Sequence, residues 1–139
     1  MNRRNNPNKG LLSPPGGKLH TDEAESPFAC AVREAREECN LVSDTKDWRL
    51  RGIVTERDYP NIGNIMLFVF EYKKSIEVLP EDSEEGVFCF VHPKDIQNSN
   101  IPETDKLYLW KFVLKNNDDM FSIHIDCNKE PMKGVVEHE

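Results

Sequence analysis

The chain lacks any apolar run long enough to span a bilayer, and its polar N-terminus does not have the pattern of a signal peptide. Positive charge is also scarce: 18 Lys and Arg against 25 Asp and Glu give a net charge of −7, which argues against a general nucleic-acid binder. No CxxC spacing or paired histidine accompanies the four cysteines, so we expect reduced thiols. These absences together predict a cytoplasmic protein with neither nucleic-acid nor membrane partners.

The length of 139 residues suits one domain, which we place at residues 1–127, followed by a flexible tail over 128–139. The pattern of apolar residues predicts an α/β (α+β) chain with a mixed β-sheet. Strands are expected over 48–56, 64–72, 86–91 and 120–126, the last at a sheet edge. A second helix is expected over 104–115, with Thr104 as its cap.

The clearest predicted element is a helix that starts at Ser26-Pro27. Serine caps helix starts, and proline suits the first helical position. Asn40 is expected to end this helix, because asparagine tolerates the left-handed conformation there. The predicted buried stripe consists of Phe28, Ala31, Val32, Ala35 and Cys39.

The same helix carries the segment 33–38, which reads Arg-Glu-Ala-Arg-Glu-Glu. Residues three and four apart share a helix face, so we expect Glu34, Glu37 and Glu38 to point the same way, opposite the apolar stripe. Carboxylates at this spacing repel one another unless a cation offsets their charge, and Mg²⁺ prefers such oxygen ligands. The alternative is a solvated charged face, which is common on surface helices.

With Gly16-Gly17 and Glu25 upstream, this segment resembles the box of the Nudix hydrolase family, G-x5-E-x7-R-E-U-x-E-E-x-G-U. The match covers residues 16–41, and the strand order outside it is also similar. The resemblance implies a Nudix-like α/β/α sandwich with the mixed sheet between helices. It also implies a MutT-like pyrophosphohydrolase that acts on a small-molecule nucleotide.

This sequence departs from the family box at several points. Seven residues instead of five separate Gly17 from Glu25, so the loop has a two-residue insertion around residues 20–22. Ala35 is small for the aliphatic position, and Asn40 replaces the last glycine. Family members usually have a full strand that begins further upstream than Met1, so we expect a domain that is short at its N-terminus and lacks the usual first β-strand.

The resemblance implies a role for each residue of the box. Glu37 and Glu38, with the Gly17 carbonyl, are the expected Mg²⁺ ligands, and Mn²⁺ is an alternative metal. Glu34 is expected to be a metal ligand or general base that Arg33 holds in place, and the Arg33 side chain can orient a carboxylate through two hydrogen bonds. Glu25, Gly16 and Lys18 are expected to support the helix and loop, Glu25 through an ion pair with an arginine of the box.

A further carboxylate from a distal loop takes part in several members of the family. Glu84 and Glu85 precede a predicted strand at a suitable place, and we favour Glu85. An acidic surface loop explains this pair equally well.

The function that the resemblance implies is Mg²⁺-dependent cleavage of a pyrophosphate bond in a nucleoside di- or triphosphate, or in a nucleoside-diphosphate derivative. Removal of damaged nucleotides from the cellular pool is a candidate setting. The main alternative is a non-catalytic Nudix-like module that binds a nucleotide or a protein. The intact set of Arg33, Glu34, Glu37 and Glu38 favours the enzyme. Neither the base that is recognised nor the oligomeric state can be deduced from the sequence.

Overall fold

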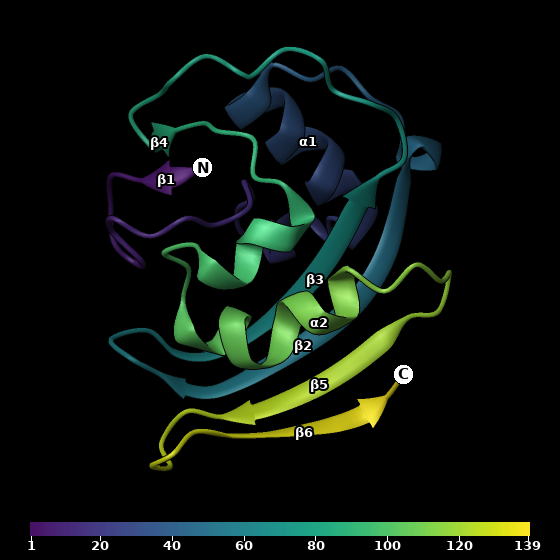
Figure 1. Cartoon of the computed structure of the whole chain (residues 1–139). Coiled ribbons are helices and arrows are strands. Elements are labelled where there is room, and N and C mark those ends of the chain that lie inside the picture. Colours follow the sequence, from purple (N-terminus) through teal and green to yellow (C-terminus); the bar gives the residue numbers. More distant parts are fainter. The chain divides into compact units, whose positions relative to one another are not determined.

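A computed structural model describes residues 1–139 of the chain, traced in Figure 1. The chain divides into two compact units. The first combines Met1–Arg49 with Glu71–Val91, and the second combines Leu50–Phe70 with His92–Glu139. No helix in the structure has both the length and the apolar character needed to cross a membrane. The two units are described in turn.

The main helix of the first unit, α1, spans Pro27–Cys39, as the capping residues predict. The Ser26 hydroxyl accepts a hydrogen bond from the Ala29 N–H at 3.1 Å, which satisfies one of the free donors of the first turn. Asn40 adopts the left-handed conformation, with φ of 50°, and its N–H donates to the Ala35 carbonyl. Cys30 and Ala35 are the buried residues of α1, whereas the other members of the predicted stripe are half-buried.

A two-stranded antiparallel sheet completes this unit. It pairs β1 (Asn2–Arg3) with β4 (Gly86–Val87). The predicted strand over 86–91 is therefore too long, because β1 offers only two residues for pairing. Two short 3₁₀ turns, η1 (Thr21–Glu23) and η2 (Thr45–Asp47), flank α1 in the sequence.

The larger sheet has the order β3-β2-β5-β6. Its strands are β2 (Trp48–Tyr59), β3 (Gly63–Tyr72), β5 (Phe121–Asp126) and β6 (Lys133–His138). The sheet is mixed, since β5 pairs in parallel with β2 and antiparallel with β6. The prediction of an α+β chain with a mixed sheet is confirmed, but β5 lies inside the sheet and not at its edge.

Strand β6 also differs from the flexible tail expected over 128–139. Its residues Val135 and Val136 face His124 and Ile123 of β5 in the antiparallel register. The strand was not predicted from the sequence because charged residues surround its two valines. Its stability comes from backbone pairing with a buried neighbour, which a local reading of the sequence does not show.

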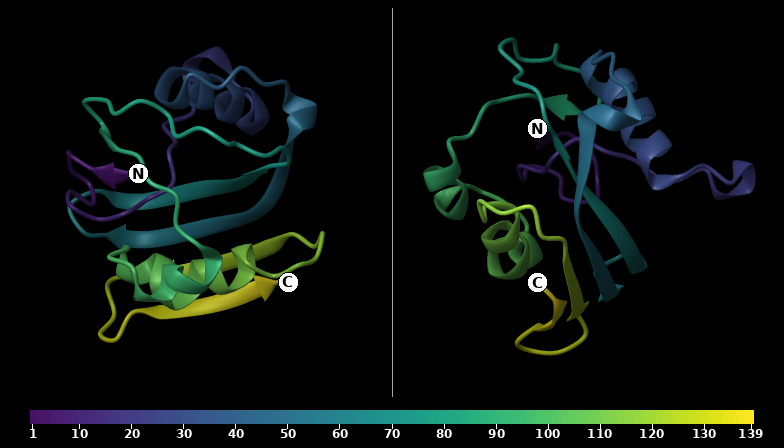
Figure 2. Two further views of the ribbon diagram at one scale, coloured as in Figure 1. Left: turned by 45° about the horizontal axis from the view of Figure 1, so that its top comes forward. Right: turned by 90° about the vertical axis from the view of Figure 1, so that its right-hand side faces the viewer.

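The helical part of the second unit comprises η3 (Pro93–Asn98), the π-helical turn η4 (Asp105–Leu109) and α2 (Trp110–Val113). The segment η4–α2 covers one face of the sheet (Figure 2). The hydrophobic core between this helical segment and the sheet consists of Val54, Leu109, Phe112, Phe121, Ile123 and Ile125. Thr104 makes no capping hydrogen bond and has helical backbone angles, so its predicted role as a cap is wrong.

Candidate active site

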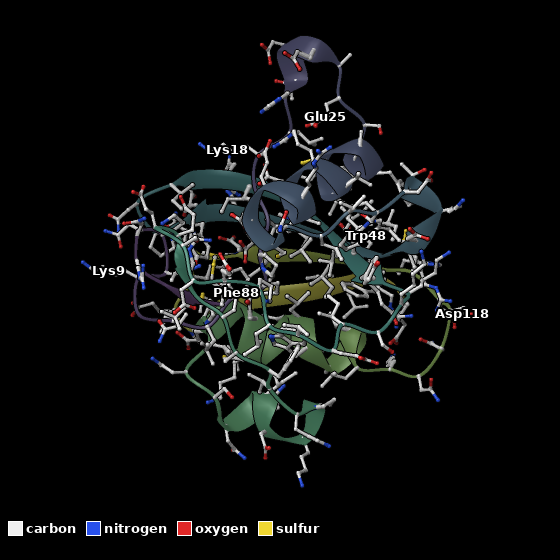
Figure 3. All side chains as sticks on the ribbon, turned by 90° about the horizontal axis from the view of Figure 1, so that it is seen from above. Lys9, Lys18, Glu25, Trp48, Phe88 and Asp118 are labelled. Atoms are coloured by element: carbon white, nitrogen blue, oxygen red, sulfur yellow. The ribbon has the colours of Figure 1, made fainter.

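The loop that leads into α1 contains the η1 turn where the sequence has its two-residue insertion. Figure 3 shows Lys18 and Glu25 in this region, near the helix. The backbone N–H of His20 donates to Glu25 Oε2 at 3.0 Å. The two inserted residues form part of the η1 turn, so Glu25 reaches the helix despite the longer loop.

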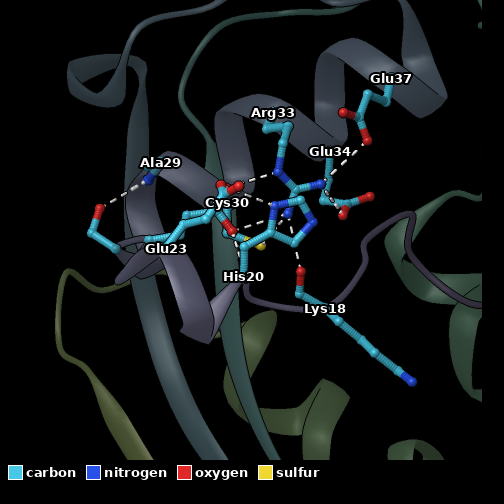
Figure 4. Close-up of polar contacts among 10 residues, drawn as sticks. Lys18, His20, Glu23, Ala29, Cys30, Arg33, Glu34 and Glu37 are labelled. Carbon is cyan, nitrogen blue, oxygen red and sulfur yellow. Dashed lines mark hydrogen bonds and ion pairs between the residues drawn. The ribbon is translucent and has the colours of Figure 1, made fainter.

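Arg33, which Figure 4 shows with its polar contacts, forms an ion pair with Glu25. The guanidinium donates from Nε at 2.7 Å and from Nη2 at 3.0 Å to the two carboxylate oxygens. Both side chains are largely buried, with 11% of Glu25 and 22% of Arg33 exposed. Hydrogen bonds from Arg33 and from the His20 backbone lower the pKa of Glu25 to about 2. The ion pair expected between Glu25 and an arginine of the box is therefore confirmed, with Arg33 as that arginine. The two-bond contact of Arg33 is made with Glu25 and not with its neighbour Glu34.

The remaining hydrogen bonds of Arg33 link the loop to the acidic face of the helix. Nη1 donates to Glu34 Oε1 at 2.5 Å and to Glu37 Oε2 at 3.2 Å, and Nη2 donates to the Lys18 carbonyl at 3.0 Å. Hydrogen bonds to Glu25 and, next, to Glu34 raise the pKa of Arg33 above its usual value. Arg33 is thus a fixed cation that orients Glu34 from one side of the site.

Gly17 approaches Glu34 from the loop. There is no room for a side chain at position 17, because the space is occupied by the Glu34 carboxylate. Glycine is required for such a close approach of backbone to a side chain. The structure therefore brings Gly17 and Glu34 together.

Glu38 lies one turn further along α1 and is half-buried. The backbone N–H of Gly16 donates to its Oε2 at 2.9 Å. Burial is the main cause of a raised pKa at Glu38, and the charges of Glu34 and Glu85 raise it further. The charge of Glu85, the favoured distal carboxylate, therefore acts on Glu38.

Comparison with known proteins now assigns the family. The model of the NUDIX domain matches residues 1–111. The chain belongs to the Nudix family. A crystal structure of the mutator MutT protein from Bacillus halodurans shares this Nudix fold, with a TM-score of 0.75 and 20% sequence identity over 94% of this chain and 85% of that one. No curated protein matches the sequence.

The Nudix residues provide oxygen donors of the kind that hard divalent cations prefer. No group of three or more His, Cys, Asp or Glu side chains converges into a ready cation cage in the structure, since Glu34 and Glu37 turn toward Arg33. Glu37 is 59% exposed and can reorient, whereas Glu34 is only 14% exposed. The residues fit Mg²⁺ in chemistry, and the concentration of negative charge around Glu38 is what a cation would offset.

An open depression of about 710 Å³ borders the Arg33 network. Arg33 and Glu37 line it from the site. The other lining residues are Ala29, Val32, Arg36, Asn40 and Thr45. The depression leaves the solvent side of Glu37 accessible.

Two contributions to the Nudix site were not predicted from the sequence. The Gly16 N–H contacts Glu38, whereas Gly16 was expected only to support the loop. Arg3 forms an ion pair with Glu85 at 3.9 Å and lies in the electrostatic environment of Glu38. No local motif marks Arg3, because its proximity to Glu85 comes from the pairing of β1 with β4.

Proposed function

We propose that this Nudix protein is a Mg²⁺-dependent pyrophosphohydrolase, with Mn²⁺ as an alternative metal. The proposed substrate is a nucleoside di- or triphosphate or a nucleoside-diphosphate derivative. The observation that carries the proposal is the Arg33 network, which orients Glu34 beside Gly17 and connects it to Glu37. A purely structural helix surface would not require a glycine pressed against a largely buried glutamate.

The proposed metal ligands are Glu34, Glu37, Glu38 and the Gly17 carbonyl. A divalent cation bound there would offset the negative charge that develops on the phosphoryl oxygens during hydrolysis. Glu38 is anchored to the loop by the Gly16 N–H, so its carboxylate has a defined position relative to Gly17. Glu25 and the Lys18 carbonyl keep the Arg33 guanidinium in place.

The proposed catalytic residues are Arg33, Glu34 and Glu85. Hydrolysis requires a group that takes a proton from the attacking water, and a carboxylate within reach of that water can do so. Glu34 is the better oriented candidate because Arg33 donates to it at 2.5 Å. Glu85 is 49% exposed and is the second candidate.

The replacement Glu38→Gln tests the proposal. It keeps the size of the side chain and its ability to accept from the Gly16 N–H, but it removes the charge that holds a cation. We expect Mg²⁺-dependent hydrolysis to fall by at least about 100-fold, within the range for loss of a group that acts on the transition state. Glu77→Gln, at an exposed position of the same unit, is the matched control and should retain activity. Full activity in Glu38→Gln would refute the assigned metal site.

A substrate panel tests the reaction class. We would incubate the protein with Mg²⁺ and nucleoside triphosphates, nucleoside diphosphates and nucleoside-diphosphate sugars, and identify the phosphate products. Faster turnover of oxidised than of standard nucleoside triphosphates would support a role in cleaning the nucleotide pool. Tight nucleotide binding without any turnover would instead support the non-catalytic module.

A further inference from the structure

The segment before the Nudix box is bonded closely to the loop that carries Glu85. Strand β1 pairs with β4, with Arg3 opposite Gly86. The Arg4 N–H donates to the Glu85 carbonyl at 2.9 Å. The Arg4 side chain donates to the Ser83 carbonyl at 2.5 Å. The backbone on both sides of Glu85 is thus held by the first residues of the chain.

Gly86 makes this close pairing feasible. A Cβ atom at position 86 would lie 2.3 Å from the backbone carbonyl oxygen of Asn2 and 2.5 Å from the Met1 side chain. Any larger residue would push β1 away from β4. Because Arg3 pairs with Gly86, the preceding residue Glu85 stays close to Arg3.

The Arg3 side chain is placed to act on Glu85. It is 17% exposed, and its Nη2 lies 3.9 Å from Glu85 Oε2. Its Nε is buried and has no hydrogen-bond partner, so the guanidinium is neither fully solvated nor engaged by another acceptor at that atom. Attraction between opposite charges is stronger where water is partly excluded. The Arg3 side chain is therefore largely buried, while the Glu85 side chain, at 49% exposure, has freedom that Arg3 can restrict.

Both groups also act on the acidic face of α1. The charge of Glu85 raises the pKa of Glu38, and the charge of Arg3 lowers it. Without Arg3, Glu85 would be repelled by Glu38 and could turn to solvent.

We propose that Arg3 is a positioning residue that restricts the Glu85 carboxylate to the orientation in which it takes part in hydrolysis. This inference rests on the proposed hydrolase function. Arg3 acts through Glu85, so its effect should disappear when Glu85 can no longer carry charge. Arg4, which contacts the same loop through a backbone carbonyl, provides a control for the purely structural role of β1.

A double-mutant cycle tests the inference. We would measure kcat and KM for Arg3→Gln, Glu85→Gln and the double variant with Mg²⁺ and the nucleoside triphosphate that the wild-type protein hydrolyses fastest. We expect Arg3→Gln to lower kcat by about tenfold with little change in KM, and to have less than about a twofold effect in the Glu85→Gln background. Arg3→Lys should recover most of kcat because it restores the charge.

The control is Arg4→Gln, which should change kcat by less than about twofold. Circular dichroism and melting temperature would be recorded for each variant. If the losses of kcat in Arg3→Gln and Glu85→Gln multiply in the double variant, Arg3 does not act through Glu85 and the inference is overturned. It is also overturned if Arg4→Gln loses as much kcat as Arg3→Gln, or if Arg3→Lys recovers none of it. These results leave the proposed function standing, because wild-type hydrolysis is measured in the same experiment. A wild-type protein that hydrolyses no substrate would overturn both proposals.

Discussion

Gly17 and Glu34 are so close that a Cβ atom at position 17 would stand 2.1 Å from Glu34 Oε1 and 2.3 Å from its carboxyl carbon. Real Cβ atoms do not approach other heavy atoms this closely, so any side chain at 17 must displace the carboxylate. Glu34 cannot move freely, because Arg33 donates to it at 2.5 Å. The loop and the helix therefore fix one another's geometry at this contact.

The replacement Gly17→Ala is expected to break this contact. Crowding of one methyl group into such a site costs about 1–3 kcal/mol of stability. We also expect at least about a tenfold loss of Mg²⁺-dependent hydrolysis, because small displacements of catalytic groups are costly. Urea unfolding and steady-state kinetics would measure the two effects.

Glu34→Ala provides the matched background, because it removes the atoms that position 17 would meet. In this background Gly17→Ala should have little effect on the free energy of unfolding. An equal cost of Gly17→Ala with and without Glu34 would show that the strain arises elsewhere in the loop.

The ion pair of Glu25 and Arg33 predicts a specific response to acid. The pKa of Glu25 is lowered from its usual 4.5 to about 2, mainly by the hydrogen bonds from Arg33. Its stabilising effect is therefore complete above pH 4.5 and is lost as the pH falls toward 2. We expect Glu25→Gln to be less stable than the wild-type protein at pH 7, with a difference that shrinks as the pH falls toward 2.

Urea unfolding at several pH values would measure this difference. Glu23→Gln is the control, since the Glu23 side chain is 73% exposed and forms its ion pair with His20 of the same loop. Its stability should follow that of the wild-type protein. A difference between Glu25→Gln and wild type that does not change with pH would exclude the ion pair as its cause.

Helix α1 could be predicted to the residue because its signals are local. Ser26, Pro27 and Asn40 each act through their own backbone angles or hydrogen bonds within one turn. The contacts of the helix are less local. The resemblance to the family implied an ion pair of Glu25 with an arginine of the box, and the structure shows that this arginine is Arg33, eight residues away, because the η1 turn returns the chain to the helix.

The strands that were predicted wrongly pair with strands that are distant in sequence or not apparent from it. The predicted strand over 86–91 shortens to Gly86–Val87 because β1 is short. Strand β6 forms from a polar tail because β5 offers it an open edge. Intrinsic strand preference cannot show the length or the location of a partner strand. The contact of Arg3 with Glu85 was not predicted for the same reason, since it depends on the pairing of β1 with β4.

The N-cap of α1 predicts a modest loss of stability when it is removed. Ser26→Ala deletes the hydroxyl that accepts from the Ala29 N–H at 3.1 Å. We expect the free energy of unfolding to fall by about 1 kcal/mol, the usual cost of losing such a cap. Ser75→Ala, at an exposed loop position, is the control and should change stability by less than about 0.5 kcal/mol in the same urea titration. A loss equal to that of the control would show that the Ser26 hydroxyl does not stabilise the start of the helix.

A buried carboxyl in the second unit predicts the opposite response to pH from that of Glu25. Glu56 is 4% exposed, and its pKa is raised from 4.5 to about 7, mainly by burial. A hydrogen bond with Thr104 opposes this rise, and the charge of Asp105 contributes to it. The pKa of Asp105 is itself raised to about 6, also mainly by burial. Thr104 bonds both carboxyls and has one hydroxyl proton, so it cannot donate to both at once.

The folded protein therefore binds more protons than the unfolded chain between pH 4.5 and 7, and its stability falls as the pH rises through this window. Since one pKa unit corresponds to about 1.4 kcal/mol, ionised Glu56 costs on the order of 3 kcal/mol above pH 7. We expect Glu56→Gln, which keeps the hydrogen bond without the charge, to be more stable than the wild-type protein at pH 8 and similar to it at pH 4.5. Glu103→Gln, at an exposed position beside Thr104, is the control. A Glu56→Gln variant that is less stable than wild type at pH 8 would show that the Glu56 charge has a stabilising partner in the fold, since loss of a buried paired charge is costly.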